Sequence, residues 1–200
     1  MGGNPPLIGV LALQGDVREH RLMLESLGAR VVEIRQPKDL LGISGLVLPG
    51  GESSVMDKLT RLFGLRGPLI SLIGSGIPVL ATCAGMILLA KELDDGIEGQ
   101  QTLGGLDITV KRNAFGSQRE SFDASLAIEG WAEPVDVSFI RAPVVTRVGE
   151  GVNIRAQLPD GRVVAVDNGS ITALAFHPEV TGEQRFHSEF LDRVRAYTAV

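Results

Sequence analysis

The sequence predicts a three-layer α/β domain with a mixed, mainly parallel sheet and antiparallel edge strands. In the first half, short apolar segments alternate with segments whose apolar residues recur at helical spacing. Strands without polar alternation are typical of a parallel sheet covered on both faces by helices. In the second half, short β-rich segments are separated by turn residues, which indicates antiparallel strands. We expect a single domain over residues 1–200, because this length supports one core.

Four strands and a first helix are expected early in the chain. The strands are short apolar segments at residues 7–13, 30–34, 45–48 and 77–81. Asp16 is expected to cap the helix that follows the first strand. Its apolar residues Leu22, Met23 and Leu27 recur at helical spacing, and Gly28 ends it.

Two more helices and a β-rich second half complete the prediction. Ser53 or Ser54 is expected to cap the second helix, with Asp57 completing a weak capping box, and the third helix covers residues 84–92. After a polar loop, strands are expected at residues 106–110, 135–140, 144–148, 153–158, 163–167 and 171–176. Residues 159–161 and 168–169 have the chemistry of hairpin turns, and an amphipathic helix over 182–197 closes the chain.

The composition excludes several classes of protein. With 44% apolar residues the chain should fold, and a net charge of −5 predicts no basic surface for nucleic acid. One cysteine excludes an internal disulfide and a cysteine-rich zinc site, and three scattered histidines predict no metal site. No signal peptide is visible, and the longest nearly apolar segment, residues 79–90, is shorter than the about 20 residues of a membrane span. We expect a cytoplasmic protein that binds neither nucleic acid nor membrane.

The lone cysteine, Cys83, lies where a buried strand changes directly into a helix. This is the context of a nucleophile elbow, a sharp turn that needs small residues two positions on either side, here Ala81 and Gly85. The start of the helix favours a thiolate and directs the backbone N–H of Ala84 toward developing oxyanion charge. A buried structural cysteine is the alternative. The strand–turn–helix context favours a nucleophile.

His177 is the expected base. It follows an apolar strand and so lies at the carboxyl edge, where open α/β sheets place their sites. Pro178 favours extended geometry, so that Glu179, two residues on, faces the same side and can hold the imidazole tautomer. A hydrogen-bonded histidine with no catalytic role is the alternative. His20 and His187 fall in helices, on faces that we expect to be solvated.

A third motif is the sequence Pro-Gly-Gly-Glu-Ser at residues 49–53. Two glycines after a buried strand expose backbone N–H groups, which suits a second oxyanion donor. The same residues could form only a turn between strand and helix. The functional interpretation depends on the nearby cysteine motif.

Together the three motifs resemble those of class I, triad-type glutamine amidotransferases. Longer segments resemble one subfamily, the glutaminase subunit of pyridoxal 5′-phosphate synthase. They are Leu-Ala-Leu-Gln-Gly at residues 11–15, Ala-Thr-Cys-Ala-Gly-Met-Ile-Leu-Leu-Ala at 81–90, Lys-Arg-Asn-Ala-Phe-Gly at 111–116 and Phe-Ile-Arg-Ala-Pro at 139–143. The resemblance extends over nearly the whole chain. It departs at Ser117, where arginine is expected, and at Val180, where leucine is usual.

The resemblance implies a flavodoxin-like amidotransferase fold and a set of site residues. It assigns the catalytic triad to Cys83, His177 and Glu179, and the oxyanion hole to the backbone N–H groups of Gly51 and Ala84. It assigns glutamine binding to Gly51, Glu52, Ser53, Arg112, Ile140 and Arg141. It implies no metal and no other cofactor.

The implied activity is hydrolysis of L-glutamine to L-glutamate and ammonia for vitamin B6 biosynthesis. The implied partner is a separate barrel subunit, in a dodecamer of heterodimers, which receives the ammonia through a channel. It would build pyridoxal 5′-phosphate from ribose 5-phosphate and glyceraldehyde 3-phosphate. Alternatives are the glutaminase subunit of another amidotransferase, a γ-glutamyl hydrolase or cysteine peptidase of similar fold, and a non-catalytic interaction domain. The motifs around Arg112 and Arg141 argue against a hydrolase or peptidase, and the intact triad argues against a non-catalytic domain.

Overall fold

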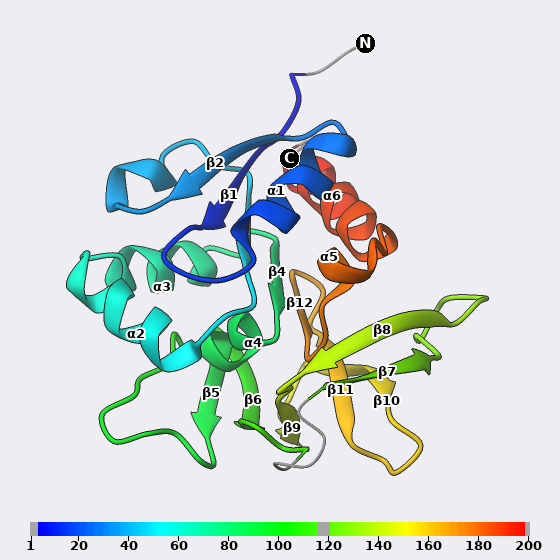
Figure 1. The fold of residues 1–200 in the computed structure, drawn as a ribbon. Coiled ribbons are helices and arrows are strands. Elements are labelled where there is room, and N and C mark those ends of the chain that lie inside the picture. Colours follow the sequence, from blue (N-terminus) through cyan, green and yellow to red (C-terminus); the bar gives the residue numbers. More distant parts are fainter. Residues whose placement is uncertain (1–3, 116–120, 199–200) are drawn as a thin grey trace.

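The computed structural model describes residues 4–115 and 121–198, and Ser117 lies outside this part. A ten-stranded sheet runs through the molecule with helices on both sides (Figure 1). Half of the sheet is parallel, with the order β2 (Arg30–Ile34), β1 (Leu7–Leu11), β3 (Gly45–Leu48), β4 (Val79–Thr82) and β12 (Ile171–Leu174). Strands β3, β4 and β12 are buried on both faces, which explains their uninterrupted apolar sequences.

The second half of the sheet is mainly antiparallel. It continues from β12 through β11 (Val163–Asp167), β9 (Val144–Val148), β6 (Leu106–Lys111) and β5 (Ala90–Leu93), while β10 (Asn153–Gln157) pairs with β11. The predicted mixed α/β fold is confirmed. The antiparallel part is larger than the expected edge, and β5 and β6 are parallel to one another.

Helices cover both faces of the sheet (Figure 1). Helices α1 (Val17–Ser26) and α6 (Arg185–Thr198) lie together on one face. Helices α2 (Ser53–Leu62), α3 (Arg66–Gly74) and α4 (Ala84–Leu89) form the other layer. Right-handed crossovers place α1 and the pair α2 and α3 on opposite faces, because β1 to β2 and β3 to β4 run in opposite directions along the sheet. A short helix, α5 (Pro178–Thr181), precedes α6, and a 3₁₀ turn, η1 (Pro37–Leu40), follows β2.

A two-stranded hairpin, β7 (Ser121–Leu126) and β8 (Val135–Ile140), stands apart from the main sheet. Aromatic packing attaches it to the body. Phe139 of β8 stacks on Phe122 of β7 with ring centroids 4.7 Å apart, and it meets Phe176 edge-on at 5.7 Å. Phe176 directly precedes His177, so this contact places the end of β8 beside the end of β12.

Several local expectations are wrong. The helix predicted over residues 84–92 ends at Leu89, because Ala90 turns extended and begins β5, which pairs with β6. Helix α3 was not expected, since its first turn contains Gly67 and Pro68. Neither was β7, whose small and polar residues do not read as a strand.

The predicted helix caps also differ from the observed ones. Glu52, rather than Ser53 or Ser54, caps α2, and its carboxylate accepts hydrogen bonds from the Ser54 N–H at 3.4 Å and hydroxyl at 3.0 Å. Asp57 is not part of a capping box, because it binds Arg61 through two hydrogen bonds. Asp16 precedes α1 as predicted, but its side chain makes no capping hydrogen bond.

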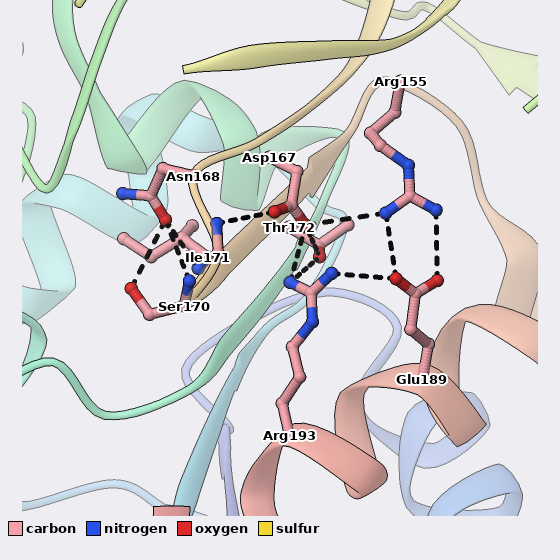
Figure 2. Close-up of polar contacts among 9 residues, drawn as sticks. Arg155, Asp167, Asn168, Ser170, Ile171, Thr172, Glu189 and Arg193 are labelled. Atoms are coloured by element: carbon pink, nitrogen blue, oxygen red, sulfur yellow. Dashed lines mark hydrogen bonds and ion pairs between the residues drawn. The ribbon is translucent and has the colours of Figure 1, made fainter. Parts of the chain in front are cut away.

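A partly buried charge network attaches α6 to the strands before the candidate site (Figure 2). Asp167 at the end of β11 accepts hydrogen bonds from Thr172 and Arg193, each at 2.6 Å. Glu189 joins Arg193 at 2.8 Å and receives a bidentate pair from Arg155 at 2.9 and 3.1 Å. The network stabilises the predicted β11–β12 hairpin and holds β12 against α6.

We expect Gly85→Ala to destabilise the fold. A Cβ at residue 85 would lie 2.0 Å from the backbone oxygen of Leu48, and only backbone movement could relieve that contact. Such overpacking costs about 1–3 kcal/mol, which urea denaturation would measure as a lower free energy of unfolding.

Gly74→Ala in α3 is the matched control. A Cβ there meets no atom within 4 Å, and alanine is the better helix former by up to about 1 kcal/mol. Its free energy of unfolding should not fall. A Gly85→Ala protein as stable as the wild type would contradict the tight packing of α4 on β3.

Candidate active site

Cys83 occupies a sharp turn between β4 and α4. Its φ of 46° lies in the left-handed region, where an L-residue is strained, and its N–H donates to the Leu174 carbonyl of β12 at 2.7 Å. The helix can begin at once because Gly85 packs directly on the Leu48 carbonyl. The Cys83 Sγ lies 3.8 Å from the Ile140 carbonyl at the end of β8. The strand–turn–helix geometry expected around Cys83 is therefore present.

His177 follows β12 and lies against the hairpin, where its N–H donates to the Ser138 carbonyl at 3.2 Å. Its Nδ1 lies 2.9 Å from Glu179 Oε1, as the sequence predicts. The route differs from the expected extended chain. Pro178 begins the short helix α5, and Glu179 lies in its first turn, so a helical turn rather than a strand brings the two side chains together.

Electrostatics favour a charged His177 beside a charged Glu179. Burial disfavours the imidazolium, but hydrogen bonds with Asp16, Cys83 and Glu179 outweigh it and raise the pKa of His177 to about 12. Burial also disfavours the Glu179 carboxylate, yet the neighbouring histidines, His20 and His177, hold the pKa of that group well below its usual range. An imidazolium can therefore face both the Glu179 carboxylate and the Cys83 sulfur.

Asp16 is a site residue that the sequence analysis took for a helix cap. Its Oδ2 lies 3.2 Å from His177 Nδ1, the atom that also faces Glu179. The 14–16 turn is held to the glycine loop, because the Asp16 N–H donates to the Gly50 carbonyl at 3.1 Å and Gln14 Oε1 accepts from the Glu52 N–H at 2.6 Å. Only tertiary contact reveals this role.

The expectation of solvated His20 and His187 is wrong, because both side chains are fully buried. His20 Nδ1 lies 2.9 Å from His187 Nε2, and His20 Nε2 lies 3.4 Å from Glu179 Oε1. The helical spacing of apolar residues in the sequence could have indicated that both histidines are buried. His20 precedes buried Met23 and Leu24 by three and four residues, as His187 precedes two buried residues of α6.

The site opens into a cavity of about 220 Å³. Cys83 and His177 line it together with all six residues that the resemblance assigns to glutamine: Gly51, Glu52, Ser53, Arg112, Ile140 and Arg141. Four further lining residues were not expected from the sequence: Gln14, Asp16, Ile87 and Asn113. Ala84 is buried and is not among the lining residues.

Opposite charges meet inside the cavity. The Arg112 guanidinium lies 3.0 Å from both Glu52 Oε1 and Gln100 Oε1. The Gln100 amide donates to Ser53 Oγ at 3.1 Å, which links the start of α2 to the loop after β5. This part of the wall therefore offers both a cation and an anion to a polar ligand.

Backbone strain is concentrated at this cavity. In the described part of the chain, three residues other than glycine have positive φ: Cys83 at 46°, Asn113 at 39° and Arg141 at 44°. All three line the cavity. Strained residues persist where the surrounding structure holds them, and they cluster at functional sites.

Asp16, His177 and Glu179 are also the residues that could hold a metal ion, since their ligand atoms lie within 4.8 Å of one another. His177 would ligate through Nδ1, which already faces both carboxylates. The same arrangement orients an imidazole for proton transfer, and the chemistry of a cysteine nucleophile needs no metal.

Comparison with known proteins decides the family. Residues 10–196 match the model of the SNO glutamine amidotransferase family. The chain belongs to this family. This match confirms the predicted resemblance to glutamine amidotransferases. It also confirms the enzyme class that the resemblance implied, which is a glutamine-hydrolysing enzyme.

Named relatives of this amidotransferase are similar over nearly their whole length. "Pyridoxal 5′-phosphate synthase subunit PdxT" of Clavibacter michiganensis subsp. michiganensis is 58% identical, over 96% of this chain and 92% of the relative. The protein of the same name from Leifsonia xyli subsp. xyli is 55% identical, over 97% and 98%. A crystal structure titled as a glutamine amidotransferase is 44% identical, with a TM-score of 0.87 over 94% of this chain and 98% of that one.

Val180, one of the two departures from the family pattern, lies on α5 and is 50% exposed. Within residues 4–115 and 121–198, none of the helices combines the length and apolar character needed to cross a membrane.

Cys83→Ala should abolish glutamine hydrolysis and leave the fold intact. The change removes only Sγ, and the chain has no second cysteine to replace it. Glutamate release measures the activity, and thermal unfolding checks the fold. Turnover close to that of the wild type would rule out Cys83 as the nucleophile.

Glu179→Gln should keep measurable activity, whereas His177→Asn should not. Removing an orienting carboxylate can cost less than removing the base, and Asp16 faces the same Nδ1 at 3.2 Å. Asp16→Asn combined with Glu179→Gln should therefore be more impaired than Glu179→Gln alone. Steady-state rates of these variants give the order. A His177→Asn enzyme more active than Glu179→Gln would instead identify Glu179 as the base.

Proposed function

We propose that this amidotransferase hydrolyses L-glutamine to L-glutamate and ammonia with a triad of Cys83, His177 and Glu179, and supplies the ammonia for pyridoxal 5′-phosphate synthesis. The observation that carries the chemistry is the convergence of Cys83 and His177 on one charged cavity, with Glu179 at 2.9 Å behind the imidazole. The named relatives support the pathway.

In the first half of the reaction, the Cys83 thiolate attacks the side-chain amide carbon of glutamine. The charged His177 then gives its proton to the amide nitrogen as the carbon–nitrogen bond breaks, and ammonia leaves. A glutamyl thioester on Cys83 and a neutral His177 remain.

In the second half, His177 takes a proton from water, and the resulting hydroxide adds to the thioester carbon. The carbon–sulfur bond breaks, the Cys83 thiolate returns, and the product carboxylic acid loses its proton to solvent. Glu179 and Asp16 orient the imidazole throughout. No metal or organic cofactor takes part in this proposal.

Backbone N–H groups of Gly51 and Ala84 are proposed to hold the tetrahedral oxyanion. Ala84 directly follows the nucleophile at the start of α4, and Gly51 lies in the cavity wall with a φ of 152°. This positive φ is one that L-residues rarely adopt, and a Cβ at residue 51 would also crowd the Gly15 Cα at 3.1 Å, so the position favours glycine.

The remaining wall residues are proposed to bind the charged end of glutamine. Its carboxylate suits Arg112 or Arg141, because a guanidinium binds a carboxylate in bidentate fashion. Its ammonium suits the Glu52 carboxylate and the Ile140 carbonyl. Ser53 and Gly51 complete the wall on the side of α2.

Released ammonia must reach an acceptor before it becomes ammonium in bulk water. We propose that a separate barrel-shaped synthase subunit receives it, within a dodecamer of heterodimers. A reducing compartment such as the cytoplasm suits the enzyme, because its nucleophile must remain a free thiol.

The enzyme should be a weak glutaminase alone and should be activated by its synthase partner. Gly50 and Gly51 let a peptide plane turn over cheaply, and the neighbouring 14–16 turn contacts this loop, so partner binding near Gln14 can select the state with two oxyanion donors. A missing donor costs about 10²–10³ in rate. Glutaminase kinetics of the purified chain, with the synthase subunit titrated in, measure the effect.

A rise in turnover that saturates with the partner is the expected result. Cys83→Ala is the control, since it should bind the partner without gaining activity. Full turnover of the isolated chain, unchanged on addition of the synthase subunit, would show that the oxyanion hole is already formed without it.

A further inference from the structure

Buried polar side chains continue the triad beyond Glu179 into the protein interior. Thr82 Oγ1 donates to Glu179 Oε1 at 3.3 Å, and His20 Nε2 lies 3.1 Å from the same hydroxyl and 3.4 Å from the same carboxylate oxygen. His20 Nδ1 in turn lies 2.9 Å from His187 Nε2. His20, Thr82 and His187 are 0% exposed. They come from α1, β4 and α6, which meet behind the catalytic residues.

The proton positions in this chain follow from its geometry. Thr82 uses its one proton on Glu179, so its oxygen can only accept from His20. His20 Nε2 faces this hydroxyl oxygen and the carboxylate, and must therefore carry a proton whether His20 is neutral or charged. Burial and the neighbouring His20 lower the pKa of His187 to about 3, so His187 is neutral. The Nε2 of His187 can pair with His20 Nδ1 whether His20 is neutral or charged, by donating in the first case and accepting in the second.

We propose that His20 is a positioning residue of the glutaminase, whose Nε2–H, held by His187, supports the Glu179 carboxylate and through it orients His177. The inference rests on the triad proposed above. It assigns a role in the reaction to the buried pair of histidines on α1 and α6.

The state of the Glu179 carboxylate supports this role. Its Oε2 is buried without a hydrogen-bond partner among the residues that the structure describes, so the contacts recorded for the group converge on Oε1. A buried carboxylate that loses a donor retains the desolvation cost of the missing contact and moves to recover it. Movement of Glu179 would change the direction of His177, whose Nδ1 it holds.

A structural role is the competing explanation, since the two histidines also tie α1 to α6. His20→Leu removes the donor while keeping a side chain of similar size. His20→Gln places an amide N–H near the position of imidazole Nε2 and so should restore support to Glu179. Thr60→Val is the matched control, because Thr60 is equally buried but donates only to the Asp57 carbonyl within α2, at 2.7 Å.

The test compares these variants in glutamine hydrolysis, in the wild-type enzyme and in the Glu179→Gln background. His20→Leu should lower kcat by about 10- to 100-fold, the usual cost of losing a partner that orients a functional group, with KM changed less than about twofold. His20→Gln should recover most of kcat, and Thr60→Val should match the wild type. In Glu179→Gln, His20→Leu should lower kcat by less than about a further twofold, since the buried carboxylate charge that His20 supports is gone.

The rate of Cys83 alkylation by iodoacetamide should show the same pattern without requiring turnover, and thermal unfolding identifies variants that fail to fold. Three results would overturn the proposal: kcat of His20→Leu within twofold of the wild type, equal loss in His20→Gln and His20→Leu, or losses that multiply in the double variant. A wild-type enzyme that does not hydrolyse glutamine even with its synthase partner would instead refute the proposed function.

Discussion

Burial of the Glu179 carboxylate is the constraint on which the rest of the site depends. A negative charge in the interior is stable only where donors converge on it, and here they come from three separate elements. His20 lies on α1, Thr82 lies at the end of β4, and His177 directly precedes α5. The parallel half of the sheet and the helices on one face must therefore be assembled before the charge is satisfied. Catalytic geometry and tertiary packing are in this sense one requirement.

Sequence reasoning found what is encoded locally. The elbow at Cys83 and the pair His177 and Glu179 are set by residues at most two positions apart. Their pattern can therefore be recognised from the sequence alone. The roles proposed for Asp16 and His20 depend on α1 lying against α5 and α6, and no local pattern in the sequence predicts which helices will meet. Among the elements, strands with continuous apolar sequences were predicted well, whereas β7 and α3 were missed. Their small, polar or helix-breaking residues are stabilised by packing rather than by propensity.

The strained backbone of the cavity is maintained by rigid surroundings. Cys83, Asn113 and Arg141 adopt positive φ at the ends of three different strands or at the loops that follow them. The strand beneath Cys83 is buried on both faces, and the charge network of Asp167, Arg193 and Glu189 fixes the neighbouring hairpin to α6 (Figure 2). The contact between Phe139 and Phe176 fixes the end of β8 to the end of β12. A strained turn costs about 1–3 kcal/mol, and such anchors are what allow it to persist.

The charge state of His177 fits the order of the proposed chemical steps. Its pKa is raised to about 12 partly by the Cys83 sulfur, which suits an imidazolium that protonates the amide nitrogen in the proposed first step. In the proposed thioester the sulfur is bonded to the acyl carbon, so its contribution to the raised pKa of His177 disappears. The imidazole left behind is then a more suitable base for water, while Glu179 and Asp16 still hold its Nδ1. In the proposed mechanism, acylation thus converts the acid of the first step into the base of the second, and deacylation returns His177 to its charged state.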